Sequence, residues 1–385
     1  MSGKANKVQG LPEGWREVRL GDISTKVMYG MNSESVDFDG NNKYIRITDI
    51  DEKTRKFTPT LLTSPAGKLE EKYRLQKNDI LFARTGASVG KTYLYDKRDG
   101  ILYFAGYLIK FNIVKENAKF VHIQTLSKKY ADWIVSMSSR SGQPGVNAEQ
   151  YKNLPLLLPP LPEQKAIASL LETWDTAIEK TEALIAAKEK RFKWLLKTLI
   201  SDQHDNPEWR TIKLENICRI KKGEQLNKLQ MIETGKYPAL NDGIVPSGYT
   251  DKWNTPANTV TISEGGNSCG YVRFNTKNFW AGGHCYTLVD LVNNLDVSFL
   301  YFQLKEKEQP IMKLRVGSGL PNIQKGDIEK FPFTLPPLSQ QKYIVNILNT
   351  TQRKIHLLKQ SAKIYRTQKR GFIQKLLTGK WKVAV

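Results

Sequence analysis

Two long segments of the chain carry apolar residues at an alternating spacing of four and three. The first begins at Gln164, and eight of its ten heptad positions are apolar: Ile167, Leu171, Trp174, Ile178, Thr181, Ile185, Lys188, Phe192, Leu195 and Leu199. The second lies 177 residues later and is also mostly apolar: Ile344, Leu348, Thr351, Ile355, Leu358, Ala362, Tyr365, Lys369, Phe372 and Leu376. This spacing is the seam of a coiled coil, so it predicts two long helices.

The two seams have equal length, and each is most simply buried against the other. About 130 residues separate the helices, which leaves the chain room to cross back and pair them antiparallel. This predicts a pseudo-twofold molecule with a globular region at each end of the helix pair. The alternative is that each helix packs on its own globular region.

The rest of the chain is also repeated once. Residues 158–165 read LPPLPEQK and recur as LPPLSQQK at 335–342, an offset of 177. At the same offset, residues 141–146 align with 318–323, whereas residues 15–20 align with 209–214 at an offset of 194. The first copy therefore holds 17 extra residues in its globular part. The repeat predicts four segments, each globular region being followed by a Pro-Pro linker and helix: 1–157, 158–206, 207–334 and 335–385.

The globular regions are predicted to be strand-rich domains of mixed α/β content, which gives an α+β fold class. Runs typical of strands are Lys43–Ile47, Asp79–Ala83 and Thr259–Ile262, rich in β-branched and aromatic residues. Helical patterns follow at residues 121–137 and 297–314, with Trp133 and Tyr301 on their apolar faces. These elements are interpreted as core.

Charge points to a polyanionic partner. The 385 residues include 59 Lys and Arg against 38 Asp and Glu, a formal net charge of +21. Residues 330–385 carry 12 basic residues and no acidic ones, so this stretch is predicted to face phosphate or an acidic protein surface. The alternative is that the charge serves solubility only.

The expected cellular compartment rests on two features that the sequence lacks. Cys218, Cys269 and Cys285 show no paired spacing, so no disulfide framework is expected. The first residues lack an apolar signal core, and no run of about 18 apolar residues occurs. The expected location is the cytoplasm.

No catalytic or metal motif can be recognised. Gly86–Thr92 has three residues between its glycines where a phosphate-binding loop needs four, and the residues after it predict a strand. A methyltransferase would need a Gly-rich cofactor turn and, for adenine, an Asn-Pro-Pro-aromatic element, and neither is present. His284, Cys285 and Cys269 lack the paired spacing of a zinc site. The chain is predicted to be a binding protein and to carry no catalytic, cofactor or metal site.

The repeated layout resembles the specificity subunits of type I restriction–modification systems. In that family two variable regions open with Pro-Glu-Gly-Trp or Pro-Glu-Trp, as here at 12–15 and 207–209, and close with Leu-Pro-Pro-Leu-x-x-Gln-Lys before a long helix. Residues 78–86, NDILFARTG, also resemble a family segment. The second region departs from it, with Ser263-Glu264-Gly265-Gly266 where the first has Ala83-Arg84-Thr85-Gly86.

The resemblance implies a noncatalytic subunit whose two target recognition domains each read one half of a split, asymmetric DNA site. The helices would set the gap between the halves and dock two adenine methyltransferase subunits, which supply S-adenosylmethionine binding and catalysis. In a restriction complex, two motor–nuclease subunits that use ATP and Mg2+ would join.

Helix length is compatible with this reading. A helix of about 38 residues is roughly 57 Å long. Two DNA-reading domains about one turn of DNA apart, roughly 34 Å, would read half-sites of about 3 to 5 base pairs. The gap between the half-sites would be about 6 base pairs.

Base reading requires polar side chains on loops that reach the grooves of DNA. Candidates in the first domain are Arg46, Thr48, Asp49, Arg84, Thr85, Ser88, Lys91, Arg140, Ser141 and Gln143. Candidates in the second domain are Asn241, Asp242, Asn267, Ser268, Arg315, Ser318 and Asn322. Any one of them can equally be a solvated loop residue.

The exposed face of the second helix is predicted to run along the DNA backbone through Lys354, Lys363, Arg366 and Arg370. Two other hypotheses compete with a specificity subunit. One is a nuclease or methylase whose motifs escape recognition, and the other is a coiled-coil scaffold for protein or RNA. Salt-dependent preference for one bipartite duplex separates the specificity subunit from the scaffold, and activity without added subunits would identify the enzyme.

Overall fold

The computed structural model describes residues 12–139, 144–203, 206–227, 230–241, 243–317, 319 and 321–383. The chain divides into two compact units, one made of residues 1–180 and 362–385 and the other of residues 181–361. Each unit therefore contains one globular domain together with a part of each long helix.

The two long helices exist as predicted. They are α4 (Leu161–Ile200) and α8 (Leu338–Leu377), of 40 residues each. All ten heptad positions of each helix are buried or half-buried in the structure. The predicted seams therefore lie on the covered faces of the helices.

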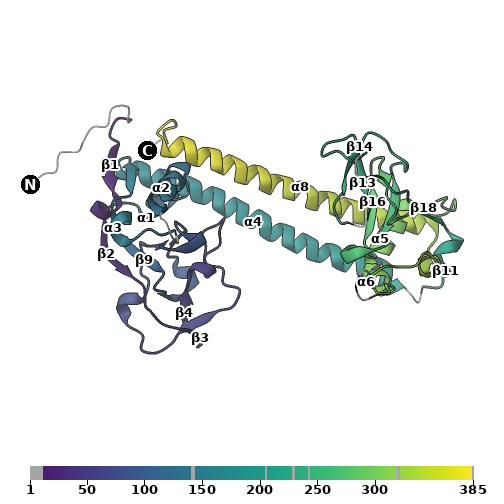
Figure 1. Ribbon diagram of the computed structural model, residues 1–385, viewed down its shortest axis with the longest axis horizontal. Helices are drawn as coiled ribbons and strands as arrows, with labels where there is room; N and C mark the ends of the chain where they lie inside the picture. The colour runs from purple at the N-terminus through teal and green to yellow at the C-terminus, as the bar shows by residue number, and fades with distance from the viewer. Residues whose placement is uncertain are drawn as a thin grey trace, which may run out of the picture. The chain divides into compact units, whose positions relative to one another are not determined.

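In the first unit the start of α4 packs against the end of α8 (Figure 1). The Trp174 ring lies 5.8 Å from the Tyr365 ring and 5.1 Å from the Phe372 ring, between centroids. Lys369, which interrupts the apolar seam, donates to the Asp175 carboxylate. The helices thus run antiparallel here.

In the second unit the end of α4 packs against the start of α8. Phe192 and Leu195 of α4 share a core with Ile344 and Leu348 of α8, and the Lys359 ammonium lies 2.6 Å from the Glu189 carboxylate. The late part of α4 therefore faces the early part of α8, which confirms the antiparallel prediction.

The helix ends also pack on the globular domains. Ile167, Leu171, Ile373 and Leu376 belong to the main core of the first domain. The two expectations for the helices are thus both partly met, because the seams cover each other and their ends extend the domain cores.

Among its described residues, the first domain has ten strands and three α-helices before α4. The strands are β1 (Arg16–Arg19), β2 (Ser24–Tyr29), β3 (Ser35–Asp37), β4 (Asn42–Ile45), β5 (Thr63–Pro65), β6 (Asp79–Ala83), β7 (Thr92–Leu94), β8 (Ile101–Phe104), β9 (Leu108–Ile113) and β10 (Pro155–Leu158). The helices are α1 (Ala118–Gln124), α2 (Lys128–Ser138) and α3 (Ala148–Lys152).

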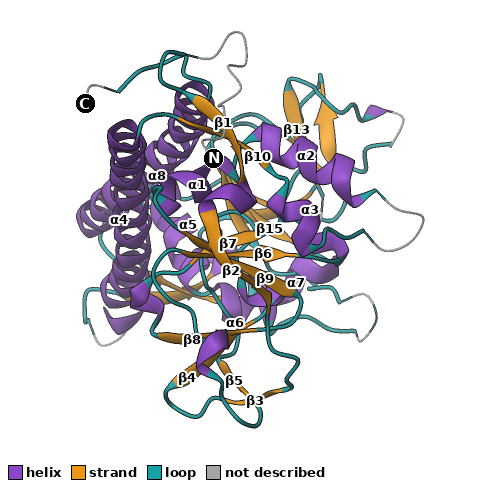
Figure 2. Ribbon diagram, turned by 90° about the vertical axis from the view of Figure 1, so that its left-hand side faces the viewer, coloured by secondary structure: helices purple, strands orange, loops and turns teal. Residues whose placement is uncertain are grey.

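A four-stranded sheet of order β2-β9-β6-β7 forms the centre of the first domain. Every residue of β6 is buried, as its apolar run predicts, and the Asp79 carboxylate accepts hydrogen bonds from Gln76 N and Asn112 Nδ2, both at 2.7 Å. The pairs β4–β8 and β3–β5 form a separate strand group (Figure 2). The sheet fixes the position of the loop that leaves β6.

The second domain repeats this plan. Its strands are β11 (Arg210–Lys213), β12 (Arg219–Lys222), β13 (Tyr237–Leu240), β14 (Gly248–Thr250), β15 (Thr259–Ser263), β16 (Val272–Asn275), β17 (Trp280–Ala281), β18 (Cys285–Val289) and β19 (Pro332–Leu335). Its helices are α5 (Val297–Glu306), α6 (Glu308–Met312) and α7 (Lys325–Glu329). The central sheet has the order β12-β18-β15-β16, which matches the first domain strand for strand.

Each helix predicted within a globular domain is broken in two. The segment 121–137 contains the end of α1 and most of α2, because the Ser127 hydroxyl accepts from Tyr130 N and caps a new helix. The segment 297–314 contains α5 and α6, and Pro310 falls in the first turn of α6, where its missing N–H costs no helical hydrogen bond. The apolar periodicity found the helical residues but missed these breaks.

A buried glutamine explains the repeated Leu-Pro-Pro-Leu-x-x-Gln-Lys motif. Gln164 donates to Pro159 O at 2.9 Å and to the Glu116 carboxylate at 2.6 Å, and it accepts from Asn117 N at 3.1 Å. Gln341 repeats this with bonds to Pro336 O, Asn294 O and Asp296 N. Each glutamine therefore ties the linker and the first turn of the long helix to the globular domain.

Within the described residues, no helix is both long enough and apolar enough to cross a membrane.

Candidate nucleic-acid interface

The loop that leaves β6 holds an arginine between two tyrosines. The Arg84 guanidinium carbon lies 5.0 Å from the centre of the Tyr29 ring and 5.7 Å from that of the Tyr107 ring. Tyr29 is 40% exposed and Tyr107 is 61% exposed, so this group borders solvent. Arg84 Nε is buried and has no hydrogen-bond partner among the described residues. The side chain is thus held in place by aromatic faces.

The turn after Arg84 contains Thr85 and Ser88, both half-buried. Thr85 forms an isolated bridge to Gly145, and Gly86 N donates to Pro144 O, so this turn and segment 144–146 lie together. The candidates Arg140, Ser141 and Gln143 lie outside the described residues. Gly86–Ser88 is one turn of 3-10 helix followed by β7, which confirms the predicted strand.

Three candidates of the first domain are engaged inside it. Asp49 is buried and accepts from Arg46 Nε at 2.9 Å and Nη2 at 3.0 Å. Lys91 is also buried, and its ammonium lies 3.1 Å from Ile50 O and 3.0 Å from the Glu52 carboxylate. Asp49 and Lys91 therefore hold the loop that presents Thr48, which is exposed.

In the second domain a carboxylate replaces the arginine. Glu264 accepts from Lys222 Nζ at 2.6 Å and from the Tyr286 hydroxyl at 2.8 Å, and its other oxygen lies 3.0 Å from His284 Nδ1. Burial raises the pKa of the Glu264 carboxyl, but the hydrogen bonds from Lys222, Tyr286 and His284 outweigh burial and the pKa is lowered. Glu264 is thus ionised near neutral pH.

The described candidates of the second domain gather around the same loop. Asn267 is exposed and Ser268 half-buried, both in the 3-10 turn Gly266–Ser268, and Gly265 bridges to Asn322. Arg315 is exposed, and Val316 next to it pairs with Asn322. Asn241 lies close by, since its Oδ1 accepts from His284 N at 2.9 Å. Asp242 and Ser318 lie outside the described residues.

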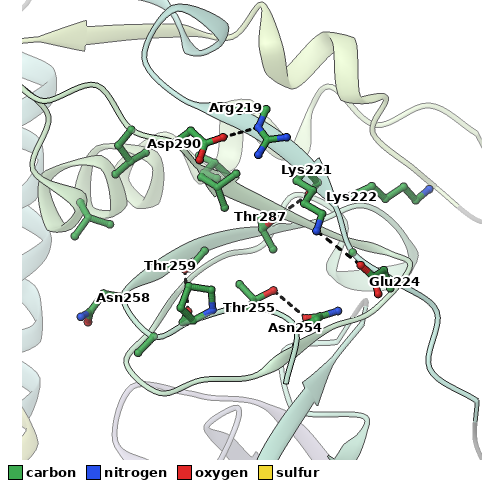
Figure 3. Close-up of a pocket in the computed structure, with 17 residues that line it drawn as sticks. Arg219, Lys221, Lys222, Glu224, Asn254, Thr255, Asn258, Thr259, Thr287 and Asp290 are labelled. Atoms are coloured by element: carbon green, nitrogen blue, oxygen red, sulfur yellow. Dashed lines mark hydrogen bonds and ion pairs between the residues drawn. The ribbon is translucent and has the colours of Figure 1, made fainter. Parts of the chain in front are cut away.

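A groove of about 460 Å³ lies beside β12 in the second domain (Figure 3). Its cations are neutralised, because Arg219 Nε lies 2.6 Å from the Asp290 carboxylate and Lys221 Nζ lies 3.7 Å from that of Glu224. Lys222 alternates to the other face of β12 and reaches Glu264. The groove therefore offers little free positive charge to an anion.

Metal and nucleophile chemistry find little support among the described residues. No group of three or more His, Cys, Asp or Glu there is placed to hold a metal ion. Burial raises the pKa of the Cys218 and Cys285 thiols to about 12, so both stay protonated. Cys269 is also buried, with a pKa raised by burial. The three cysteines are core residues.

Sequence reasoning missed the residues around Arg84 and Glu264. Tyr29, Tyr107, Lys222 and Tyr286 were not singled out, and His284 was considered only as a metal ligand. The available signal was the change from Arg84 to Glu264 in the aligned repeats, since a change of charge at one position demands different neighbours.

The family model for the type I restriction modification DNA specificity domain matches the chain twice, over residues 12–188 and 206–364. The chain therefore belongs to the family of type I restriction–modification DNA specificity proteins.

Individual relatives agree with this membership. A protein of Mycoplasma pneumoniae named as a type I specificity subunit is 34% identical over 175 residues, which is 45% of this chain. That match spans about half of the Mycoplasma protein, 46% of its length. The specificity subunit of the type I restriction enzyme MjaVIII from Methanocaldococcus jannaschii is 22% identical, and the match covers 97% of this chain and 94% of that protein.

The fold is shared with a solved structure. The crystal structure of the S subunit of a type I restriction–modification system from M. genitalium aligns with a TM-score of 0.68, covering 98% of this chain and 99% of that chain. The sequence identity of this pair is 18%, so the likeness concerns the fold.

Proposed function

We propose that this chain is the DNA sequence-recognition subunit of a type I restriction–modification complex. Each globular domain reads one half of a bipartite, asymmetric DNA site. One observation carries the proposal: the two domains have the same strand order but carry different side chains at the matching loop, Arg84 in one and Glu264 in the other. A shared scaffold with different readers suits a site whose halves differ.

In this proposal the catalytic work belongs to partner subunits. Two adenine methyltransferase subunits would dock on the helices and bring S-adenosylmethionine, and two motor–nuclease subunits with ATP and Mg2+ would complete a restriction complex. Exposed apolar side chains outside the seams support a docking role for the helices: Leu170, Leu184, Trp194, Leu357 and Ile364. The complex would act on DNA in the cytoplasm.

Purified full-length protein, with its methyltransferase partner, should select one gapped sequence from a pool of randomised duplexes. Enrichment of two short motifs at a fixed spacing is the expected result. Absence of any enriched duplex sequence, together with binding to RNA or to a protein, would instead support a scaffold. Methylation or cleavage by the chain alone would support an enzyme.

The exposed basic residues Lys354, Lys363, Arg366 and Arg370 on α8 are proposed to contact DNA phosphates. Changing all four to glutamine should weaken binding to every duplex without altering the selected sequence. The plot of log affinity against log salt concentration should flatten by about 0.9 for each phosphate that the variant no longer neutralises. Both effects can be measured by fluorescence anisotropy at several salt concentrations.

Lys359→Gln provides the control for this prediction. Lys359 lies on the same helix, and its ammonium is 2.6 Å from the Glu189 carboxylate. Its removal should change the salt dependence little. A quadruple variant that selects a different sequence would contradict a backbone role for these four residues.

A further inference from the structure

Arg84 and Glu264 occupy the same backbone position in the two domains. Arg84 N donates to Tyr107 O at 3.1 Å, and Arg84 O accepts from Val146 N at 2.9 Å. Glu264 N donates to His284 O at 2.9 Å, and Glu264 O accepts from Ile323 N at 2.8 Å. Tyr107 and Val146 precede His284 and Ile323 by 177 residues, the offset of the repeat. The hydrogen-bonded frame is therefore the same in both copies while the side chains differ.

The neighbouring strand supplies a second matched pair. Tyr29 pairs with Ile109 across β2 and β9, and Lys222 pairs with Tyr286 across β12 and β18. A glycine follows in each case, and a Cβ there would lie 2.2 Å from Ala105 O at Gly30 and 2.3 Å from Gly282 O at Gly223. The close approach of two backbones thus places Tyr29 and Lys222 alike.

Two equivalent triads result, each within its own unit. The first triad is Tyr29, Arg84 and Tyr107, and the second is Lys222, Glu264 and His284. In the first a cation lies between two aromatic rings, and in the second a carboxylate lies between two potential cations.

The first triad leaves hydrogen-bond donors available. Among the described residues the Arg84 guanidinium pairs with no carboxylate, and its Nε is buried without an acceptor. Contact with two rings restricts the side chain, so less conformational entropy is lost when it binds a ligand. A fixed guanidinium matches the O6 and N7 acceptors of guanine in the major groove.

The second triad works differently because its carboxylate is enclosed. The Glu264 side chain is 6% exposed, whereas Lys222 is 51% and His284 is 54% exposed. Glu264 accepts from three side chains, so it acts on a ligand only through the groups that it holds. Since His284 Nδ1 bonds to Glu264, the ring atom left for a ligand is Nε2.

We propose that these equivalent triads make the two DNA half-sites different at one base pair. Arg84 reads a guanine in the first half-site. His284, oriented by Glu264 as a positioning residue, makes the equivalent contact in the second half-site, to a base edge with an exocyclic amino group. This inference rests on the proposed function, because it assigns a role within the same DNA-reading loops.

The test uses full-length protein with its methyltransferase partner and a pool of randomised duplexes. For Arg84→Ala, preference for guanine at one position of the first half-site should fall about 5- to 150-fold, the range of one bidentate base contact. The second half-site should be unchanged. Arg84→Lys keeps the charge but loses the fork, so its affinity for duplexes without guanine at that position should stay near the wild-type value while its preference for guanine falls.

The matched control is Arg98→Ala, which removes the same charge from the same domain. Arg98 is paired with Asp96 at 2.5 Å, and its loss should leave every base preference in place. A loss of affinity in Arg84→Ala that is equal for all sequences, and that Arg84→Lys restores, would assign Arg84 to a phosphate and overturn the inference, as would unchanged base preferences.

Glu264→Gln tests the second triad. The base preference of this variant should change at one position of the second half-site, and the first half-site should be unchanged. His284→Ala should alter the base preference at the same position. Changes spread over both half-sites would overturn the positioning role. If the wild-type protein selects no bipartite site at all, the proposed function fails. If the wild-type protein selects such a site and the variants leave its base preferences unchanged, only the inference about the triads fails.

Discussion

Replacing Gln164 with leucine is expected to lower the free energy of unfolding by about 3 kcal/mol or more. Leucine has similar volume but cannot bond to Pro159 O, Asn117 N or the Glu116 carboxylate, which Gln164 now satisfies. Each buried polar group left without a partner costs about 1 to 3 kcal/mol. Urea unfolding of the full chain, followed by circular dichroism, measures the loss.

Lys165→Ala is the control for this variant. Lys165 is the next residue in the same helix, but it is exposed, and its loss should change stability by about 0.5 kcal/mol at most. Gln341→Leu should reproduce the large loss, because Gln341 makes the corresponding bonds in the second unit. A Gln164→Leu protein as stable as the Lys165→Ala variant would show that the Gln164 hydrogen bonds do not hold the linker and helix to the globular domain.

Inserting four residues near Ala186 of α4 is expected to change the gap of the recognised DNA site and to leave both half-sites unchanged. Four residues add about 6 Å of helix and slightly more than one turn, so the apolar seam stays near its register. If the helices set the spacing, the gap should change by about two base pairs, at about 3.4 Å per base pair. Selection from randomised duplexes gives the gap directly.

The same four residues inserted after Gly67 provide the control. Gly67 is exposed, and a Cβ there would meet nothing within 4 Å, so the loop can accept extra residues. This variant should keep the wild-type gap. An unchanged gap in the α4 variant would mean that the helices do not determine the spacing.

The architecture was predictable because its signals are regular and repeated. That all the heptad positions are buried or half-buried follows from spacing alone, and the second copy of the pattern identified the partner of the first. The helix breaks at Ser127 and Lys307 were missed because the apolar periodicity continues across them, although the capping hydroxyl of Ser127 and the nearby Pro310 were visible in the sequence.

The candidate site was less predictable because side-chain partners come from distant strands. Lys91 and Asp49 have the chemistry of DNA-reading residues, but sequence does not reveal that Ile50, Glu52 and Arg46 already bind them. Glu264 was recognised as a departure from the first copy, but its partners lie on β12, on β18 and directly before β18. Only the sheet topology brings these residues together.

We propose that this chain determines which DNA sequence a type I complex recognises. The most direct test compares adenine methylation across the genome of the source organism, by long-read sequencing, with and without this gene. Without the gene, methylation is expected to be lost at one gapped, asymmetric motif and to persist elsewhere. An identical methylation pattern in both strains, with the methyltransferase partner expressed, would contradict it.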